Sequence, residues 1–437
     1  MLRTPLELRN LSFLLAFNGL LGLGVASCGA TQREPGTLDE PDAAKPPAPL
    51  PETGPIVQCT TADCDKDGVP APLDCNDLDP AIGPEAYDFV GDGVDNDCDG
   101  KADNPVATCE TVPAAAPGSP TDFARAADLC PQPGKTAAGA YDPLVRAEWG
   151  LVKGLGPGQR LWTSETKMQQ VNIVTSFGDN KPRLGKTMFG LSTGPWGAAD
   201  PRNSPPLDEA GFRISDGCAA IPLNAKDCLS LSFGSPAGGI GVQDWAELKL
   251  TVKVPRNANA MVFDYAFFST EFNQFWHASL NDAFFVLVNG TKHAGDNVAK
   301  ESNGLGMSVN SSFFQICTKA PGPPGLSLDK SAALSDCLGV DGDASKNAFG
   351  SLKGTGFDGA GSPPGDGTAK STDGTKLYVY GGGSGWLTAK FAVTPGETMT
   401  VRLLIHDTFD GLKDSSVLVD NLRFEAASTE GGVFRPR

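Results

Sequence analysis

Positive charge and histidine are both scarce in this sequence. Its 437 residues include 35 Lys and Arg against 52 Asp and Glu, so the formal net charge is −17. This shortage argues against the basic footprint of nucleic-acid-binding proteins, and we expect no nucleic-acid partner. The three histidines lie in no H-E-x-x-H motif, and no G-x-S-x-G nucleophile elbow occurs. We therefore expect a protein that is not an enzyme.

A glycan hydrolase is the enzymatic alternative, because that chemistry requires only two carboxylates at a suitable separation. Glu271 and Asp282 are the candidates for such a pair. The neighbours His406 and Asp407 make a poor catalytic pair, since adjacent residues of a strand point to opposite faces.

Long runs with helical periodicity are also scarce, whereas Gly (53) and Pro (35) are abundant. Short alternating apolar runs recur instead, at residues 246–254, 261–269, 283–288, 377–380, 387–393, 399–406 and 416–424. Asn289-Gly290 and Pro395-Gly396 are turn signals next to these runs. The pattern predicts a mainly β fold, an antiparallel β-sandwich.

The apolar run at residues 11–25 is too short to remain as a membrane helix and is typical of a signal peptide. It ends in Val25-Ala26-Ser27-Cys28, which resembles the lipobox of bacterial lipoproteins. The resemblance implies that Cys28 carries the lipid that attaches the protein to a membrane. Gly29 in place of Asp favours the outer membrane, with the protein facing the periplasm or the cell surface. Ordinary cleavage, with Cys28 incidental, is the alternative.

Composition divides the remainder into successive segments. We predict a lipoprotein signal peptide (1–27), a lipid-anchored Pro/Ala-rich linker (28–57), an acidic metal-binding module (58–104), a second linker (105–140), a β-sandwich domain (141–427) and a tail (428–437).

Eleven cysteines, less Cys28, leave ten, which allows up to five disulfides in an oxidising compartment. The connectivity stays open at this point. The local pairs we consider are Cys75 with Cys98, Cys109 with Cys130, Cys218 with Cys228, and Cys317 with Cys337.

Two acidic segments of the form D-x-D-x-D-G begin at Asp63 and Asp95. Alternate acids in a tight loop can point at one centre, and the glycine permits the sharp turn. Calcium takes six to eight oxygen ligands, so we predict Ca²⁺ binding; a solvated acidic loop without metal is the alternative. The candidate ligands are Asp63, Asp65, Asp67, Val69, Asp74, Asn76, Asp77, Asp79, Asp95, Asp97, Asp99, Lys101 and Asp103.

Residues 65–103 resemble the MopE-type metal-binding motif, through Asp74-Cys75-Asn76-Asp77, Pro84-Glu85 and the run from Asp92 to Gly100. The family name is associated with copper. The module contains no histidine, and hard carboxylates favour calcium over copper. A cysteine that the family often carries near residues 88–91 is absent here.

Residues 263–272, 280–284, 393–396 and 405–418 resemble the choice-of-anchor L family of surface and secreted proteins. The resemblance covers most of residues 150–426. The resemblance implies a jelly-roll-like sandwich and no established biochemical role.

Acidic residues at predicted strand ends of this domain suggest a second metal site, formed by Asp282, Asp407, Asp410 and Asp414. Turn and capping chemistry is the alternative explanation of these residues. Trp245, Trp276, Tyr380 and Trp386 could form a platform that stacks on sugars, or they could be core residues.

These expectations combine into one hypothesis: a calcium-binding cell-surface lipoprotein whose β domain serves adhesion or ligand binding. The partner would be a surface glycan or a protein. A carbohydrate-binding surface module is the alternative.

Overall fold

A computed structural model describes residues 61–109, 119–136, 139–149, 170–197, 240–272, 282–302, 304, 306–314, 351–358, 381–408 and 413–436, with six short strands between them. The lipobox, both Cys218 and Cys228, Cys337 and Asp410 lie outside the described residues. For Cys317 only the backbone is described. Among the described helices, none is both long enough and apolar enough to cross a membrane.

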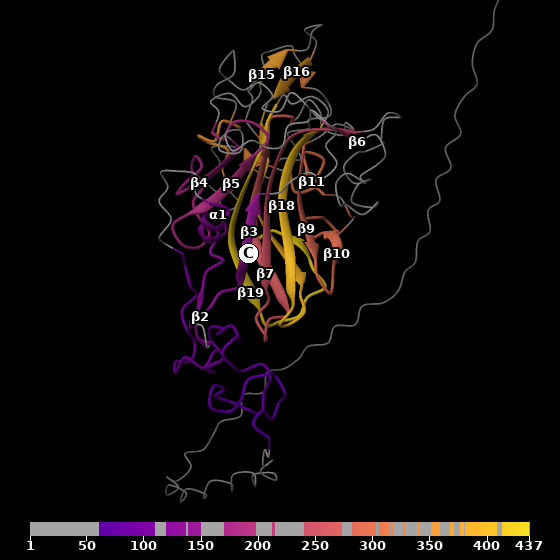
Figure 1. The fold of residues 1–437 in the computed structure, drawn as a ribbon. Helices are drawn as coiled ribbons and strands as arrows, with labels where there is room; N and C mark the ends of the chain where they lie inside the picture. The colour runs from indigo at the N-terminus through magenta and orange to yellow at the C-terminus, as the bar shows by residue number, and fades with distance from the viewer. Residues whose placement is uncertain are drawn as a thin grey trace, which may run out of the picture. The chain divides into compact units, whose positions relative to one another are not determined.

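The described fold is mainly β, as the sequence predicts, and two antiparallel sheets dominate it (Figure 1). The first sheet has the order β10-β9-β18-β7-β3, with β11 on β9 and β6 on β7. Its strands are β3 (Leu144–Trp149), β6 (Phe212–Ile214), β7 (Ile240–Lys253), β9 (Ala283–Asn289), β10 (Ala294–Asn297), β11 (Met307–Ser308) and β18 (Thr398–Thr408).

The second sheet has the order β14-β12-β17-β8-β19-β5-β4, with β20 on β17. Its strands are β4 (Val171–Val174), β5 (Met188–Ser192), β8 (Ala260–Ser269), β12 (Ile316–Cys317), β14 (Gly339–Val340), β17 (Gly382–Ala392), β19 (Ser415–Glu425) and β20 (Gly432–Phe434). The short β12–β14 pair is parallel.

Two small sheets and one helix complete the described structure. The small sheets contain β1 (Gln132–Thr136), β2 (Gly139–Tyr141), β13 (Ser327–Leu328), β15 (Thr368–Lys370) and β16 (Lys376–Val379). Helix α1 (Pro120–Ala126) begins with proline, whose missing N–H costs nothing at that position. Its Phe123 packs edge-on against Trp149 and Phe189, which places the helix on the core.

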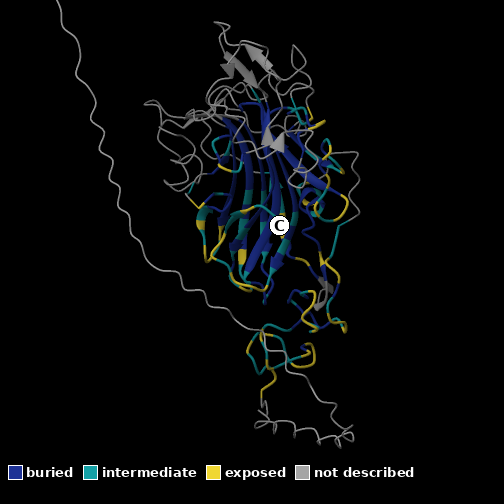
Figure 2. Cartoon of the chain, turned by 180° about the vertical axis from the view of Figure 1, so that it is seen from behind, coloured by how far each residue is buried: buried dark blue, intermediate teal, exposed yellow. Residues whose placement is uncertain are grey.

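The main core lies between the two large sheets, where alternate residues of facing strands meet. On β7 these are Leu248, Leu250 and Val252, as the alternating pattern predicts. They pack with the apolar sides of β8, β9, β17, β18 and β19. Figure 2 shows these strands as the buried part of the chain. A smaller cluster that contains Phe268, Phe357 and Trp386 covers the other face of β8 and β17.

The two predicted turns differ in what their glycines do. At Pro395-Gly396, the Glu397 N–H donates to the Thr394 carbonyl at 3.1 Å, and Gly396 has φ +73°, as a type II turn requires. The β9–β10 hairpin also forms, but its turn spans residues 290–293, because Asn289 still pairs with Ala294. A Cβ at Gly290 would lie 2.9 Å from Glu397 Oε2 and 3.0 Å from Met399 Cβ, so a larger residue there would be closely packed against both side chains.

A buried pair of acidic residues joins the end of α1 to the second sheet. Asp128 is 6% exposed and Asp420 is fully buried. Asp420 accepts the N–H groups of Arg183, Leu184 and Asn421. Burial raises the pKa of Asp128 to about 6, and burial together with the nearby Asp128 raises the pKa of Asp420 to about 8. The folded pair therefore retains protons that the unfolded chain has lost above pH 4.

We predict that this pair makes the protein less stable as the pH rises from about 4 to about 8. Over that range the folded state binds more protons than the unfolded state, so the free energy of unfolding falls with pH. Asp128→Asn supplies a permanent donor to Asp420, and Asn accepts the left-handed φ of 65° at this position. At pH 8 we expect it to stabilise the protein by about 1–2 kcal/mol.

Urea unfolding at pH 5 and pH 8, at fixed calcium concentration, checks this. Asp179→Asn is the matched control, because Asp179 is an exposed carboxylate paired with Lys353. If Asp128→Asn changed the free energy of unfolding equally at the two pH values, the result would contradict a proton held between Asp128 and Asp420.

Candidate metal centres

The first candidate centre is the loop that contains Asp63, Asp65 and Asp67. Each offers one carboxylate oxygen, and these three atoms lie within 4.8 Å of one another. The backbone fixes their directions: Asp63 accepts the N–H groups of Lys66 (2.8 Å) and Gly68 (3.1 Å), and Asp65 accepts that of Asp67 (3.0 Å). The alternate acids therefore converge, as the motif predicts.

The second centre repeats this geometry 32 residues later, with Asp95, Asp97 and Asp99. Asp95 accepts the Gly100 N–H at 2.9 Å, just as Asp63 accepts that of Gly68. The fourth and sixth residues of both loops have positive φ: Lys66 and Gly68 at 65° and 94°, Cys98 and Gly100 at 59° and 97°. The two loops are thus structural copies of one turn.

Further carboxylates surround the first centre. Burial, and then Asp65, Asp77 and Asp63, raise the pKa of Asp74, while its bond from the Asn76 N–H opposes the shift. The pKa of Asp65 is also raised, by partial burial and by Asp63 and Asp77. Asp77 accepts the Cys64 N–H at 3.3 Å, which ties residue 77 to the loop. The sequence-predicted residues 74 and 77 therefore lie near the first loop, in which residues 63, 65 and 67 converge.

The second centre surrounds a fully buried carboxylate, Asp97. Burial raises its pKa to about 6, and Asp99, Asp88 and Asp95 add to that rise. Asp88 was not among the predicted ligands. It accepts the N–H groups of Asn96 (3.3 Å) and Asn104 (2.6 Å) and so encloses the loop. Its position in the stretch that departs from the family pattern gave no local signal for this role.

Four carboxylate oxygens in these centres are buried and accept no hydrogen bond: Asp65 Oδ2, Asp67 Oδ2, Asp74 Oδ2 and Asp97 Oδ2. Asp67 Oδ2 forms an ion pair with Arg256, and the other three have no such partner among the described residues. A buried anionic oxygen without a donor is costly. A bound cation would satisfy it, and a set of hard oxygens suits calcium. The residues present therefore fit a divalent ion of this class.

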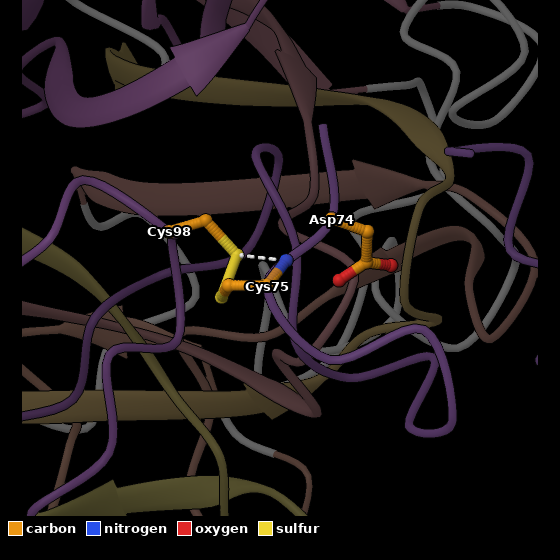
Figure 3. Close-up of side chains that lie close together, drawn as sticks. All are labelled: Asp74, Cys75 and Cys98. Atoms are coloured by element: carbon orange, nitrogen blue, oxygen red, sulfur yellow. Dashed lines mark hydrogen bonds between the residues drawn. A yellow bond between two sulfur atoms is a disulfide. The ribbon is translucent and has the colours of Figure 1, made fainter. Parts of the chain in front are cut away.

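Sulfur ligands are excluded from both centres. Cys75 and Cys98 form a disulfide, as the sequence suggests, and so do Cys109 and Cys130. In Figure 3 the Asp74 carboxylate lies beside the disulfide, with one oxygen within 4.8 Å of both sulfurs, and the Cys75 N–H donates to Cys98 Sγ at 3.0 Å. Because Cys75 follows Asp74 and Cys98 belongs to the second loop, this disulfide connects the two centres.

The remaining predicted ligands have local partners. The N–H groups of Val69 and Lys101 donate to Asp67 (2.6 Å) and Asp99 (2.8 Å), that of Asn76 donates to Asp74 (2.8 Å), and Asp79 accepts that of Ala81 (3.0 Å). Asp103 accepts the N–H groups of Gly91 (2.5 Å) and Gly93 (3.1 Å), and these bonds lower its pKa. Asp103 therefore closes the 91–93 turn.

The predicted second metal site in the sandwich does not assemble among the described residues. Asp282, Asp407 and Asp414 are all buried, but they are not among the groups of three with ligand atoms within 4.8 Å. Asp282 instead accepts the Ser415 hydroxyl at 2.6 Å, and its N–H donates to Glu271 at 2.7 Å. Asp410 lies outside the described residues.

The two described tryptophans of the predicted sugar platform are only 3% exposed. Trp245 stacks on His406 and donates to Glu247 at 3.1 Å, and Trp386 belongs to the smaller apolar cluster. Core packing is therefore their role in the described structure. Trp276 and Tyr380 lie outside the described residues.

Comparison with known families supports the assignment of the module. A family model described as "Putative metal-binding motif" matches residues 74–104. The match contains the second centre and Asp74, but not the loop at 63–69. No curated protein and no solved structure matches the chain. The motif and the two carboxylate clusters together indicate a metal-binding module.

We predict that Asp97→Asn has opposite effects with and without metal. In chelator it should stabilise the protein by about 1 kcal/mol, because it removes a buried charge that three other carboxylates repel. With calcium it should weaken binding at least tenfold, because it removes a charged ligand. Thermal melts with chelator and with calcium measure both effects of the substitution. A lower melting temperature in chelator would contradict the repulsion between Asp97 and its neighbouring carboxylates.

Proposed function

We propose that the acidic module binds two calcium ions, one in each centre, and that these ions hold the module in its fold. The observation that carries the proposal is the set of three buried carboxylate oxygens for which the described residues supply neither a hydrogen bond nor an ion pair. Much of residues 61–104 is irregular loop, and its few buried apolar side chains give limited stability. Segments that cannot build a core commonly depend on metals or disulfides.

Calcium should therefore raise the melting temperature of the protein, and chelator should lower it. Isothermal titration calorimetry of the chelator-treated protein should give two equivalents of bound calcium. Asp97→Ala should remove one of them. Magnesium is the comparison ion, because it demands octahedral geometry and releases water reluctantly. Heat changes with magnesium equal to those with calcium, or no binding at all, would sink the proposal.

We further propose that the protein is a non-enzymatic lipoprotein of the bacterial surface, attached through Cys28, with the calcium-bound module ahead of a sandwich that serves adhesion or ligand binding. The residues that support attachment are Val25-Ala26-Ser27-Cys28. The sandwich supports a binding role through its rigid core, which can hold surface loops in place.

Attachment predicts that Cys28→Ala releases the protein from the membrane. Expressed in a Gram-negative host with a labelled fatty acid, the wild type should carry the label and sediment with the outer membrane. The variant should carry no label and remain in the soluble fraction. Label on the variant, or an unlabelled wild type, would contradict a lipid at this residue.

A further inference from the structure

The two loops share one backbone conformation but differ in what holds their fifth residue. In the second loop, Asp99 Oδ2 accepts a bond from the Asn104 side chain at 2.9 Å. Asn104 is neutral and belongs to the same module. In the first loop, Asp67 Oδ2 forms an ion pair with Arg256. Arg256 is charged and lies 189 positions further along the chain, between β7 and β8.

Arg256 is fixed in place by its surroundings. Its side chain is 12% exposed and that of Asp67 is 4% exposed. Its N–H donates to the Glu85 carbonyl at 3.2 Å. A side chain at Gly83 would lie 2.9 Å from Arg256 Nη1 and 3.4 Å from Asp67 Oδ2, so the glycine leaves room for the guanidinium.

The next residue, Asn257, reinforces the same contact. Its side-chain amide accepts the Tyr87 N–H at 2.8 Å and donates to the Tyr87 carbonyl at 2.7 Å. Tyr87 also contacts Phe424 of β19 and belongs to the main core. The Arg256-Asn257 turn of the sandwich is therefore hydrogen-bonded to the segment 83–87, and it places a fixed positive charge at the first centre.

A fixed cation beside Asp67 has two consequences. It neutralises part of the crowded negative charge when no metal is bound. It also repels a divalent ion that enters the same loop, and at a partly buried position this repulsion is weakly screened. The second centre contains no such cation among the described residues, and its Asp97 oxygen remains buried without a donor.

We infer that Arg256 is a positioning residue of the first centre, which acts as its built-in counter-ion and makes this centre the weaker of two calcium sites. This inference rests on the proposed function and goes beyond it, because it ranks the two sites and links the first to the sandwich.

The test is calcium titration of the full chain in an Asp97→Ala background, which leaves the first centre to bind. Arg256→Gln should tighten that binding about tenfold, since the repelling charge is gone. Arg256→Lys retains the charge and should stay within about threefold of the parent. Arg146→Gln is the matched control, because Arg146 is an exposed arginine paired with Glu148, and it should change nothing. A purely structural role predicts a lower melting temperature without tighter binding, and that result would overturn the inference.

A second measurement does not depend on changing Arg256. Asp97→Ala leaves the first centre and Asp65→Ala leaves the second, so their dissociation constants compare the two sites directly. We expect the Asp65→Ala protein to bind calcium more tightly. The reverse order would refute the inference while the proposed function stands. Failure of the wild type to bind calcium would instead refute the proposed function.

Discussion

Crowded negative charge in a segment with little core is the constraint on which the structure of the acidic module depends. Carboxylates held within a few ångströms of one another repel, and burial strengthens the repulsion. The module limits this cost by three means. Backbone N–H groups donate to Asp63, Asp95 and Asp103, the disulfide between Cys75 and Cys98 connects the loops, and Arg256 supplies one positive charge. The oxygens that remain unsatisfied are those around which a cation fits.

The same physical problem is solved differently in the sandwich. There, three buried carboxylates have polar protein partners: Asp282 accepts a serine hydroxyl, Asp264 accepts the Thr388 hydroxyl, and Glu247 pairs with Arg402. Asp420 accepts hydrogen bonds from backbone N–H groups and lies next to the carboxyl group of Asp128. Its pKa is raised, so a bound proton neutralises its charge. Buried acids are therefore not in themselves a sign of metal. The contrast lies in the donors: Asp97 Oδ2 has none, whereas these residues have partners that belong to the fold.

Most of the sequence predictions that the structure supports rest on patterns within a few neighbouring residues. The alternation at 246–254 predicts β7 because apolar residues two apart share a face, and the D-x-D-x-D-G spacing predicts convergence because the loop bonds span only two to five residues. Cys75 and Cys98 lie within the same short module, so their pairing could be predicted from the sequence. The contacts of Arg256, Asn257 and Asp128 could not be predicted in this way. Each depends on a partner far along the chain, and nothing in the neighbouring sequence indicates it.

The two loops show which properties of a site can be predicted from the sequence and which depend on distant contacts. Their backbones match at the fourth and sixth residues because lysine or cysteine, then glycine, can enter the left-handed region in the same turn. From sequence alone they would be expected to bind metal equally. The side chain that reaches the fifth residue breaks the equivalence: an amide from within the module in one loop, and a guanidinium from the sandwich in the other. Ligand spacing can thus indicate the type of site, while a contact from far along the chain distinguishes two sites that share that spacing.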